Sequence, residues 1–315
     1  MINFRLKFFT FILVIVIFIF SIFLCEFVLR YIGLGDPIIY EKNASWRYSL
    51  LEDQERQRFN NNIVKINKAG LRSNKEWIKK DNKLILFIGD SVTYGGSKID
   101  NSELFSEKVC ELIKKDFVCG NAGVNGYGIL NMVLRTKFDE RIKNADVVVF
   151  VVILEDFWRG LVDIKHMHYF TSSPNRIFPA LEEALNFISW KYDINNYLGH
   201  RDKTPEKENL EQTMHINATN FAINIFNQEI ERLKSINKNV FVFFSPTKSS
   251  LIKSEKEWVE EIKKIVLENT KNIFNMSSEF KKTNLDLYYD NVHYNVLGHE
   301  IAAKVIFKEI RDKLN

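Results

Sequence analysis

The chain has 315 residues, of which 46% are hydrophobic, and this is enough for a substantial buried core. Lysine and arginine number 44 against 40 acidic residues, so the surplus of four makes no case for a nucleic-acid-binding protein. No internal repeat or low-complexity tract is visible, and the composition indicates an ordered globular protein.

The N-terminus carries the most apolar stretch of the chain. A helix over Phe8–Leu29 would span roughly 33 Å, which is long enough to cross the hydrocarbon core of a bilayer. A cleaved signal peptide would end in small residues, whereas bulky residues at 22–24 precede Cys25 here, which also disfavours a lipoprotein. We therefore predict an uncleaved single-pass membrane anchor over 8–29.

The charges that flank this stretch suggest its orientation. Arg5 and Lys7 precede it without a nearby acid, although Arg30 and Lys42 follow it. We expect residues 1–7 to be cytoplasmic and the rest of the chain to lie outside the cytoplasm, at the cell membrane.

Two cysteines fall in the part of the chain that follows the anchor. Cys110 and Cys119 could form a disulfide outside the cytoplasm, but buried free thiols are the commoner state of such residues. We expect them to be free thiols.

The remaining sequence alternates between strand and helix patterns. Residues 30–80 are polar, with a short strand at 63–67, and are predicted to form a juxtamembrane segment that packs on a main domain over 81–315. Residues 84–88 are continuously apolar, as in a strand buried on both faces of a parallel sheet. The alternation predicts one α/β domain with a parallel sheet. Further strands are expected at 117–119, 147–154 and 240–244, and helices at 102–115, 129–138, 222–236, 255–267 and 297–314.

Residues 157–215 interrupt this alternation and are predicted to be an insertion. It is either a lid or substrate wall or a purely structural excursion. His166 and His168 lie close together in it, but they lack an obvious third ligand, so we expect no metal and no cofactor. Its tryptophan and tyrosine residues are Trp158, Tyr169, Trp190, Tyr192 and Tyr197.

Gly89, Asp90 and Ser91 follow the apolar run at 84–88 directly. Ser91 is therefore expected just past the C-terminal end of a buried strand, the edge at which open α/β sheets bind ligands. The next helix can offer backbone N–H groups to a developing negative charge. Three small turn residues after a strand are common, so this tripeptide alone is a weak signal.

An acid–histidine pair precedes the last predicted helix. Asp290 stands three residues before His293 and can hold the imidazole Nδ1–H, which leaves Nε2 free to accept a proton from a serine hydroxyl. The pair alone would also fit an ordinary surface contact. His299 is a competing histidine, but it falls inside the predicted helix with no acid three residues before it.

Taken together, these pieces resemble the SGNH/GDSL hydrolase family from residue 83 to the C-terminus. The family's first block appears at 87–95, its second at 121–128 and its last at 290–293. The resemblance implies a three-layer α/β/α sandwich of flavodoxin-like type with Ser91 as nucleophile and His293 as base, supported by Asp290. It also implies that the backbone N–H groups of Ser91 and Gly126 form part of an oxyanion hole.

The third block departs from the family pattern. The family has Gly, any residue, Asn and Asp after a buried strand, and the Asn donates to the oxyanion, whereas residues 153–156 place Glu155 at that position. An ionised carboxylate offers no donor and would repel an oxyanion. Glu155 is therefore protonated in a dry pocket, or Asn125 or another donor replaces it, or the site is weak or inactive.

The resemblance implies acyl transfer from an ester through an acyl-Ser91 intermediate to water or to a sugar hydroxyl. A single anchor with such a domain outside the membrane is similar to bacterial proteins that add or remove O-acetyl groups on envelope polysaccharides. Such domains often work beside a multi-span membrane acyltransferase. The alternative is a non-catalytic carbohydrate-binding or assembly subunit that keeps the fold, which Glu155 favours.

Overall fold

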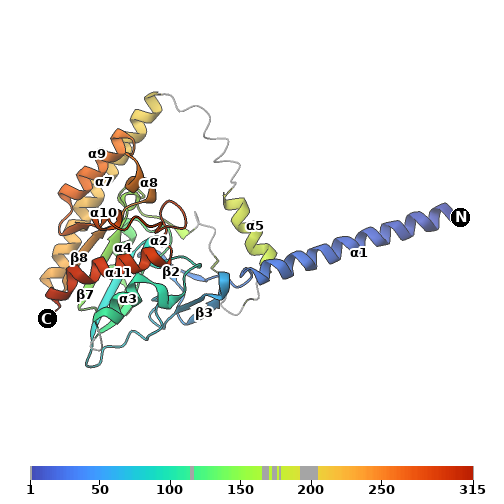
Figure 1. Cartoon of the computed structure of the whole chain (residues 1–315), viewed down its shortest axis with the longest axis horizontal. Helices are drawn as coiled ribbons and strands as arrows, with labels where there is room; N and C mark the ends of the chain where they lie inside the picture. The colour runs from blue at the N-terminus through green and yellow to red at the C-terminus, as the bar shows by residue number, and fades with distance from the viewer. Residues whose placement is uncertain are drawn as a thin grey trace.

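The computed structural model describes residues 2–113, 117–164, 170, 171, 176, 179–191 and 205–314. A long N-terminal helix, α1 (Ile2–Tyr31), projects from an α/β body that contains both β-sheet and helical layers (Figure 1). Within it, Leu6–Tyr31 has a mean hydropathy of 3.1 and none of its apolar window is buried. By length and composition α1 can therefore cross a membrane, as a signal sequence also can.

The body is built on a five-stranded parallel sheet in the order β6-β5-β7-β8-β9. Numbered along the chain, this order is 2-1-3-4-5, that of flavodoxin-like doubly wound sheets. The predicted α/β fold with a parallel sheet between helical layers is confirmed. The strands are β5 (Lys83–Gly89), β6 (Phe117–Asn121), β7 (Val147–Val152), β8 (Asn239–Phe244) and β9 (Ile273–Asn275).

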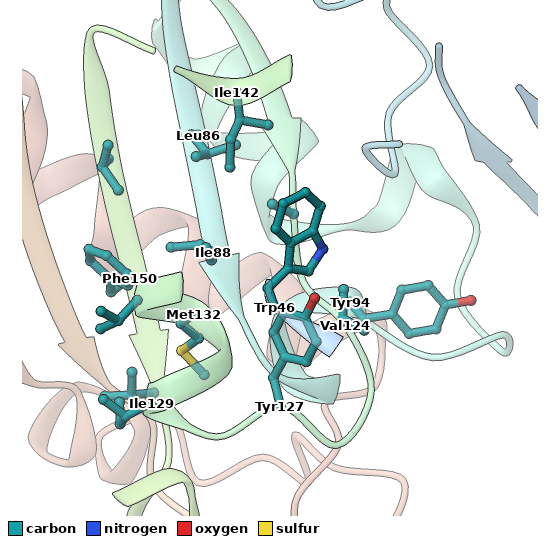
Figure 2. Close-up of a cluster of buried hydrophobic side chains, with 14 of the residues drawn as sticks. Trp46, Leu86, Ile88, Tyr94, Val124, Tyr127, Ile129, Met132, Ile142 and Phe150 are labelled. Atoms are coloured by element: carbon teal, nitrogen blue, oxygen red, sulfur yellow. The ribbon is translucent and has the colours of Figure 1, made fainter. Parts of the chain in front are cut away.

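Each strand supplies side chains to two separate cores, because successive residues point to opposite faces of a sheet. In β5, Leu86 and Ile88 belong to one core and Ile85 and Phe87 to the other. Figure 2 shows part of the first core, where Leu86 lies beside Ile142 and Ile88 lies between Leu86 and Met132 of α4. Helices α4 (Ile129–Phe138), α7 (Pro205–Ser235) and α9 (Glu257–Asn269) cover this face, and α3 (Phe105–Ile113) and α11 (Val296–Ile310) cover the other.

The element boundaries match the sequence predictions where apolar periodicity is strong. Helix α4 has the predicted range. Helix α7 begins at Pro205, whereas the prediction began it at residue 222. The prediction missed the first part of α7 because that part is mostly polar and has little apolar periodicity. Strand β7 ends at Val152 because the Ile153 N–H donates to Asp156 Oδ2 at 3.0 Å, which starts a 3₁₀ turn. The shorter helices are α2 (Ser91–Tyr94), α5 (Ala180–Lys191), α8 (Lys248–Ile252) and α10 (Ser277–Lys281), and the 3₁₀ turns are η1 (Phe59–Asn61), η2 (Asn101–Glu103), η3 (Glu140–Ile142), η4 (Leu154–Phe157) and η6 (Arg311–Lys313).

The segment between α1 and β5 forms two antiparallel hairpins that pack into the body. Tyr48 and Leu50 of the first hairpin are fully buried, as are Val64 and Ile66 of the second. All four belong to the same core as the α4 face of the sheet. The first hairpin consists of β1 (Tyr40–Asn43) and β2 (Arg47–Leu50), and the second of β3 (Gln54–Gln57) and β4 (Ile63–Ile66).

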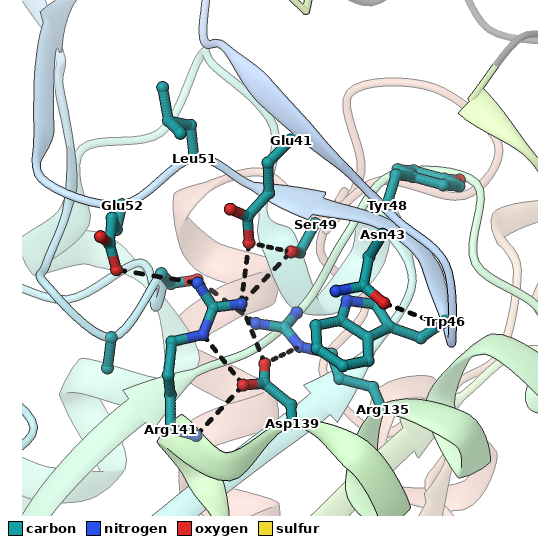
Figure 3. Close-up of polar contacts among 12 residues, drawn as sticks. Glu41, Asn43, Trp46, Tyr48, Ser49, Leu51, Glu52, Arg135, Asp139 and Arg141 are labelled. Atoms are coloured by element: carbon teal, nitrogen blue, oxygen red, sulfur yellow. Dashed lines mark hydrogen bonds and ion pairs between the residues drawn. The ribbon is translucent and has the colours of Figure 1, made fainter.

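A charged cluster also ties the first hairpin to the body (Figure 3). The Arg141 guanidinium contacts Glu41 at 2.8 Å and Asp139 at 2.9 Å, and it donates to Ser49 Oγ at 3.4 Å. Burial would raise the pKa of Asp139, but Arg141 and Arg135 hold it below its ordinary value. Asp139 is therefore ionised, and the hairpin is attached by charge as well as by its apolar side chains.

The expectation that Cys110 and Cys119 are free thiols is wrong. They form a disulfide, with their Cα atoms 5.9 Å apart. Helix α3 packs against β6, and this brings the two residues together although they are nine positions apart in sequence.

Arg72 is fully buried and organises the loop that follows α2. Its Nε donates to Asn101 Oδ1 at 2.9 Å, and its Nη1 donates to the carbonyls of Tyr94 and Gly96 at 2.7 and 2.6 Å. Its Nη2 donates to the Ile99 carbonyl. A single side chain thus satisfies several buried acceptors near the end of β5.

Replacing Arg72 with leucine should lower the free energy of unfolding by about 2–4 kcal/mol, because the loop carbonyls lose their charged donor inside the protein. Denaturant unfolding of the full chain in detergent measures this. Arg311→Leu, a change at a half-exposed arginine, should stay within about 0.5 kcal/mol of the native protein. Equal stabilities for the two variants would show that the Arg72 bonds contribute little.

Candidate active site

Ser91 begins α2 immediately after the C-terminal end of β5. Asp90 caps this short helix, and its Oδ1 accepts the Val92 N–H at 2.9 Å. Strands β6 and β7 flank β5 on opposite sides, so the chain order of the strands reverses here. Such a switch point is where doubly wound sheets bind their ligands.

The loop after β6 lies against α2 because Gly123 allows a close approach. A Cβ at Gly123 would stand 2.2 Å from the Tyr94 backbone nitrogen, which no side chain can do without displacing the helix. The Val124 N–H donates to the Gly89 carbonyl at 3.2 Å and holds the same loop at the end of β5. The first and second sequence blocks therefore lie side by side.

The structure brings Ser91, His293 and Asp290 together. The Ser91 Oγ lies 2.8 Å from His293 Nε2, and His293 Nδ1 lies 2.7 Å from Asp290 Oδ2. With the proton on Nδ1 and facing the carboxylate, Nε2 is left as an acceptor for the serine hydroxyl. This geometry suits proton transfer from Ser91 to His293.

Asp290 is held as a carboxylate by its own turn. Its Oδ1 accepts the backbone N–H groups of Val292 and His293, both at 2.8 Å. Burial would raise the pKa of Asp290, but these two donors and the imidazole hold it below the ordinary value. The carboxylate thus stays charged and orients the imidazole ring.

Neighbouring elements brace the loop that carries His293. Asn291 accepts the Lys248 N–H on its carbonyl at 2.7 Å and the Ser249 N–H on Oδ1 at 2.8 Å. The Tyr294 hydroxyl lies 2.5 Å from Ser245 Oγ, just beyond β8. The histidine therefore rests on a loop fixed at several points.

His299 has a structural role in this arrangement. It is fully buried, its ring stacks on Phe105 at 5.6 Å, and its Nδ1 accepts the Phe105 N–H at 3.2 Å. Burial lowers the pKa of His299 to about 3, so the ring is neutral at physiological pH. It joins α11 to α3.

The first hairpin holds the loop in which Gly126 lies. The Tyr48 hydroxyl donates to the Asn125 carbonyl at 2.8 Å, and Asn125 Nδ2 donates to the Tyr40 hydroxyl at 3.0 Å. Gly126 follows with φ of +79°, a left-handed conformation. The Tyr127 hydroxyl completes the contact by donating to the Tyr48 carbonyl. No sequence pattern marks this hairpin as part of the site.

Glu155 lies in the 3₁₀ turn after β7, half-buried and beside the Asp90 carboxyl. Among the described residues, its Oε2 has no hydrogen-bond partner although the atom is buried. Burial raises the pKa of Glu155, and Asp90 and Glu255 act in the same direction against Arg159. A protonated carboxyl can donate a hydrogen bond. These surroundings favour a protonated Glu155, while the Asn125 amide nitrogen is engaged with the hairpin.

Arg159 joins all three sequence blocks near Ser91. Its Nη1 donates to Asp90 Oδ2 at 3.1 Å, to Asp156 Oδ1 at 2.8 Å and to the Tyr127 carbonyl at 2.9 Å. Burial and the Asp90 charge raise the pKa of Asp156, and Arg159 opposes them. Its place three residues after Asp156 is the only sequence signal for this role, and that signal is too weak to predict it.

Several predicted features fall outside the part of the chain that the structure describes. These are His166, His168, Tyr169, Tyr192 and Tyr197 of the insertion, together with the Trp190 side chain. Within the described part, no three His, Cys, Asp or Glu side chains are grouped so that they could hold a metal ion.

No protein-family model matches the chain, and no curated protein does so. Similar solved structures include Axe2, an acetylxylan esterase from Geobacillus stearothermophilus, at 17% identity and a TM-score of 0.44 over 74% of this chain and 96% of that one. Another is a member of the lipolytic protein G-D-S-L family from Veillonella parvula, at 14% identity and a TM-score of 0.39 over 72% of this chain and 97% of that one.

These likenesses concern the fold alone. The sheet order, Ser91 at the end of β5 and the Asp290–His293 turn before the last long helix are what the resemblance to the SGNH/GDSL family implies. The observed fold, a parallel sheet in flavodoxin-like order between two helical layers, is the one that this resemblance implies.

Tyr48→Phe should lower kcat for a soluble ester by about tenfold with a smaller change in KM. The ring stays in the core, but the Asn125 carbonyl loses its donor and the loop becomes more mobile. The expected effect is smaller than that of removing an oxyanion donor outright, which lowers kcat by about 10²–10³-fold. Steady-state kinetics with p-nitrophenyl acetate measure the two constants. Tyr31→Phe at an exposed tyrosine should change neither, and an unaltered kcat in Tyr48→Phe would mean that the hairpin does not position the loop.

Glu155→Gln should keep its activity at high pH while the native protein loses activity as pH rises through the raised pKa of Glu155. Ionisation converts a donor into a repelling charge, whereas the amide donates at every pH. Profiles of kcat/KM from about pH 5 to about pH 9 compare the two, with exposed Glu257→Gln as control. A Glu155→Gln protein that is inactive throughout would show that the carboxyl has another role.

Proposed function

We propose that this protein transfers acyl groups from ester substrates through a covalent acyl-Ser91 intermediate. The observation that carries the proposal is the hydrogen-bonded series from Asp290 through His293 to Ser91, with contacts of 2.7 and 2.8 Å. A serine hydroxyl is too weak an acid to ionise unaided, so it needs a correctly placed base to attack an ester.

The proposed reaction has two balanced steps. Ser91 Oγ bonds to the ester carbonyl carbon while its proton passes to His293 Nε2. The bond to the leaving oxygen then breaks, and the departing alcohol takes that proton. In the second step an acceptor hydroxyl, from water or from a sugar, gives its proton to Nε2 and attacks the acyl carbon. Ser91 leaves with the proton, and the enzyme is restored.

The negative charge on the carbonyl oxygen requires donors that are fixed before the reaction. We assign the backbone N–H groups of Ser91 and Gly126 to this role, with protonated Glu155 as a third donor. The fixed loop around Asn125 and the raised pKa of Glu155 support this assignment.

The substrate that we propose is an O-acetylated polysaccharide of the cell envelope. Helix α1 would anchor the chain with its N-terminus inside, so that the catalytic domain lies outside the cytoplasm. The disulfide between Cys110 and Cys119 supports this placement, because disulfides persist mainly in oxidising compartments. If the acceptor is a sugar, a multi-span membrane acyltransferase is the partner that would supply acyl groups.

The second candidate function is a non-catalytic carbohydrate-binding or assembly subunit with the same fold. Glu155 favours it, because a carboxyl group stands where the family has an asparagine donor. The two functions differ in whether Ser91 reacts.

A fluorophosphonate probe should label the full chain at Ser91. The variant Ser91→Ala should lose the label, and its turnover of p-nitrophenyl acetate should fall by at least about 10³-fold. Ser102→Ala, a change at an exposed serine, should keep both. A folded native chain with neither labelling nor turnover would favour the binding subunit. Acetate release compared with sugar acetylation in the same assay separates a hydrolase from a transferase.

A further inference from the structure

Helix α5 lies where α1 joins the body, and the two helices are in contact (Figure 1). In that view α5 runs across the end of α1 rather than along it. If α1 crosses a bilayer, α5 therefore lies closer to the plane of the membrane surface than to its normal.

Polar contacts with α1 fix α5 in this place. The Glu26 carboxylate of α1 accepts the backbone N–H groups of Ala180 and Leu181 at 2.8 and 2.9 Å, so it caps the start of α5. It also pairs with Arg30 at 2.7 Å, which secures the cap near the end of the apolar run.

A carboxylate of α5 itself attaches the helix to the body. Glu183 accepts the Gly35 N–H at 2.7 Å and forms a buried ion pair with Arg58. Glu26 of α1 binds the start of α5, and Glu183 of α5 binds Gly35 and Arg58 just beyond the end of α1. The depth of α5 therefore follows from the depth of α1.

Helix α5 exposes several apolar side chains. Leu185 and Ile188, three residues apart and so on one face of the helix, are 57% and 49% exposed, and Phe187 is also exposed. Helices with such a face, placed at a membrane boundary, lie in the interface with their apolar side chains about 5–10 Å into it.

We propose that α5 is an interfacial helix whose Leu185 and Ile188 enter the outer edge of the lipid bilayer beside α1. This rests on the membrane anchor of the proposed function. The sequence of α5 contains Glu182 and Glu183 against one basic residue, Lys191, so its insertion draws on apolar burial and not on anionic lipid. Together, α1 and α5 would fix the tilt of the catalytic body over the membrane.

Depth-dependent fluorescence quenching tests this with the full chain in phosphatidylcholine vesicles. On a Cys25→Ser background that keeps the disulfide, single cysteines at Leu185 and Ile188 carry an environment-sensitive dye. Phe18→Cys reports on the anchor. Ile252→Cys is the matched control, an isoleucine that is 75% exposed on α8, away from α1.

The dyes at Leu185 and Ile188 should be quenched more by lipids brominated near the headgroup than by lipids brominated deep in the chain, equally with and without anionic lipid. The dye at Phe18 should be quenched best by the deep bromines, and the dye at Ile252 by neither. If Phe18 is quenched while the α5 dyes behave like Ile252, this inference fails and the anchor stands. If Phe18 is not quenched, the anchor fails as well. Shielding of the α5 dyes by other protein copies, without lipid quenching, would also overturn it.

Discussion

The site depends on one constraint, the close seating of α2 on the C-terminal end of β5 at the point where the sheet order reverses. A parallel sheet presents the carboxyl ends of all its strands at one edge, so residues that follow β5, β6 and β7 must meet there. The glycine at 123 lets the second loop touch the α2 backbone. At the same edge the Ser91 hydroxyl lies 2.8 Å from Nε2 of His293.

Charged side chains near Ser91 join the loops at this edge of the sheet. Three carboxyl groups, those of Asp90, Glu155 and Asp156, crowd around one guanidinium, that of Arg159. One cation cannot stabilise three neighbouring anions in a buried setting, so at least one carboxyl group is favoured in its neutral form. The pKa values of Glu155 and Asp156 are both raised in these surroundings, chiefly by burial, and the neighbouring Asp90 charge acts in the same direction.

Local patterns predicted those parts of the molecule that local physics determines. The apolar run of β5, the periodicity of α4 and the Asp290–His293 spacing are each visible within a few residues. The contact of Tyr48 with Asn125 spans 77 positions, so no local pattern predicts it. The Arg159 contacts depend on the 3₁₀ turn after β7, which has no periodic pattern in the sequence. Strand β9 is too short and too mixed for a period to appear. The prediction of free thiols was wrong because the pairing of Cys110 with Cys119 depends on the packing of α3 against β6, which the sequence does not show.

The segment between α1 and β5 therefore does more than link two parts of the chain. It begins at the end of α1, where Glu26 binds α5, and its Arg58 also binds α5. Its first hairpin carries Tyr48, which donates a hydrogen bond to the loop of Gly126. A flexible tether would let the body move freely over a membrane and would leave that loop without support. Here one structured segment makes both sets of contacts, so α5 and the loop of Gly126 are both attached to the stretch of chain between α1 and β5.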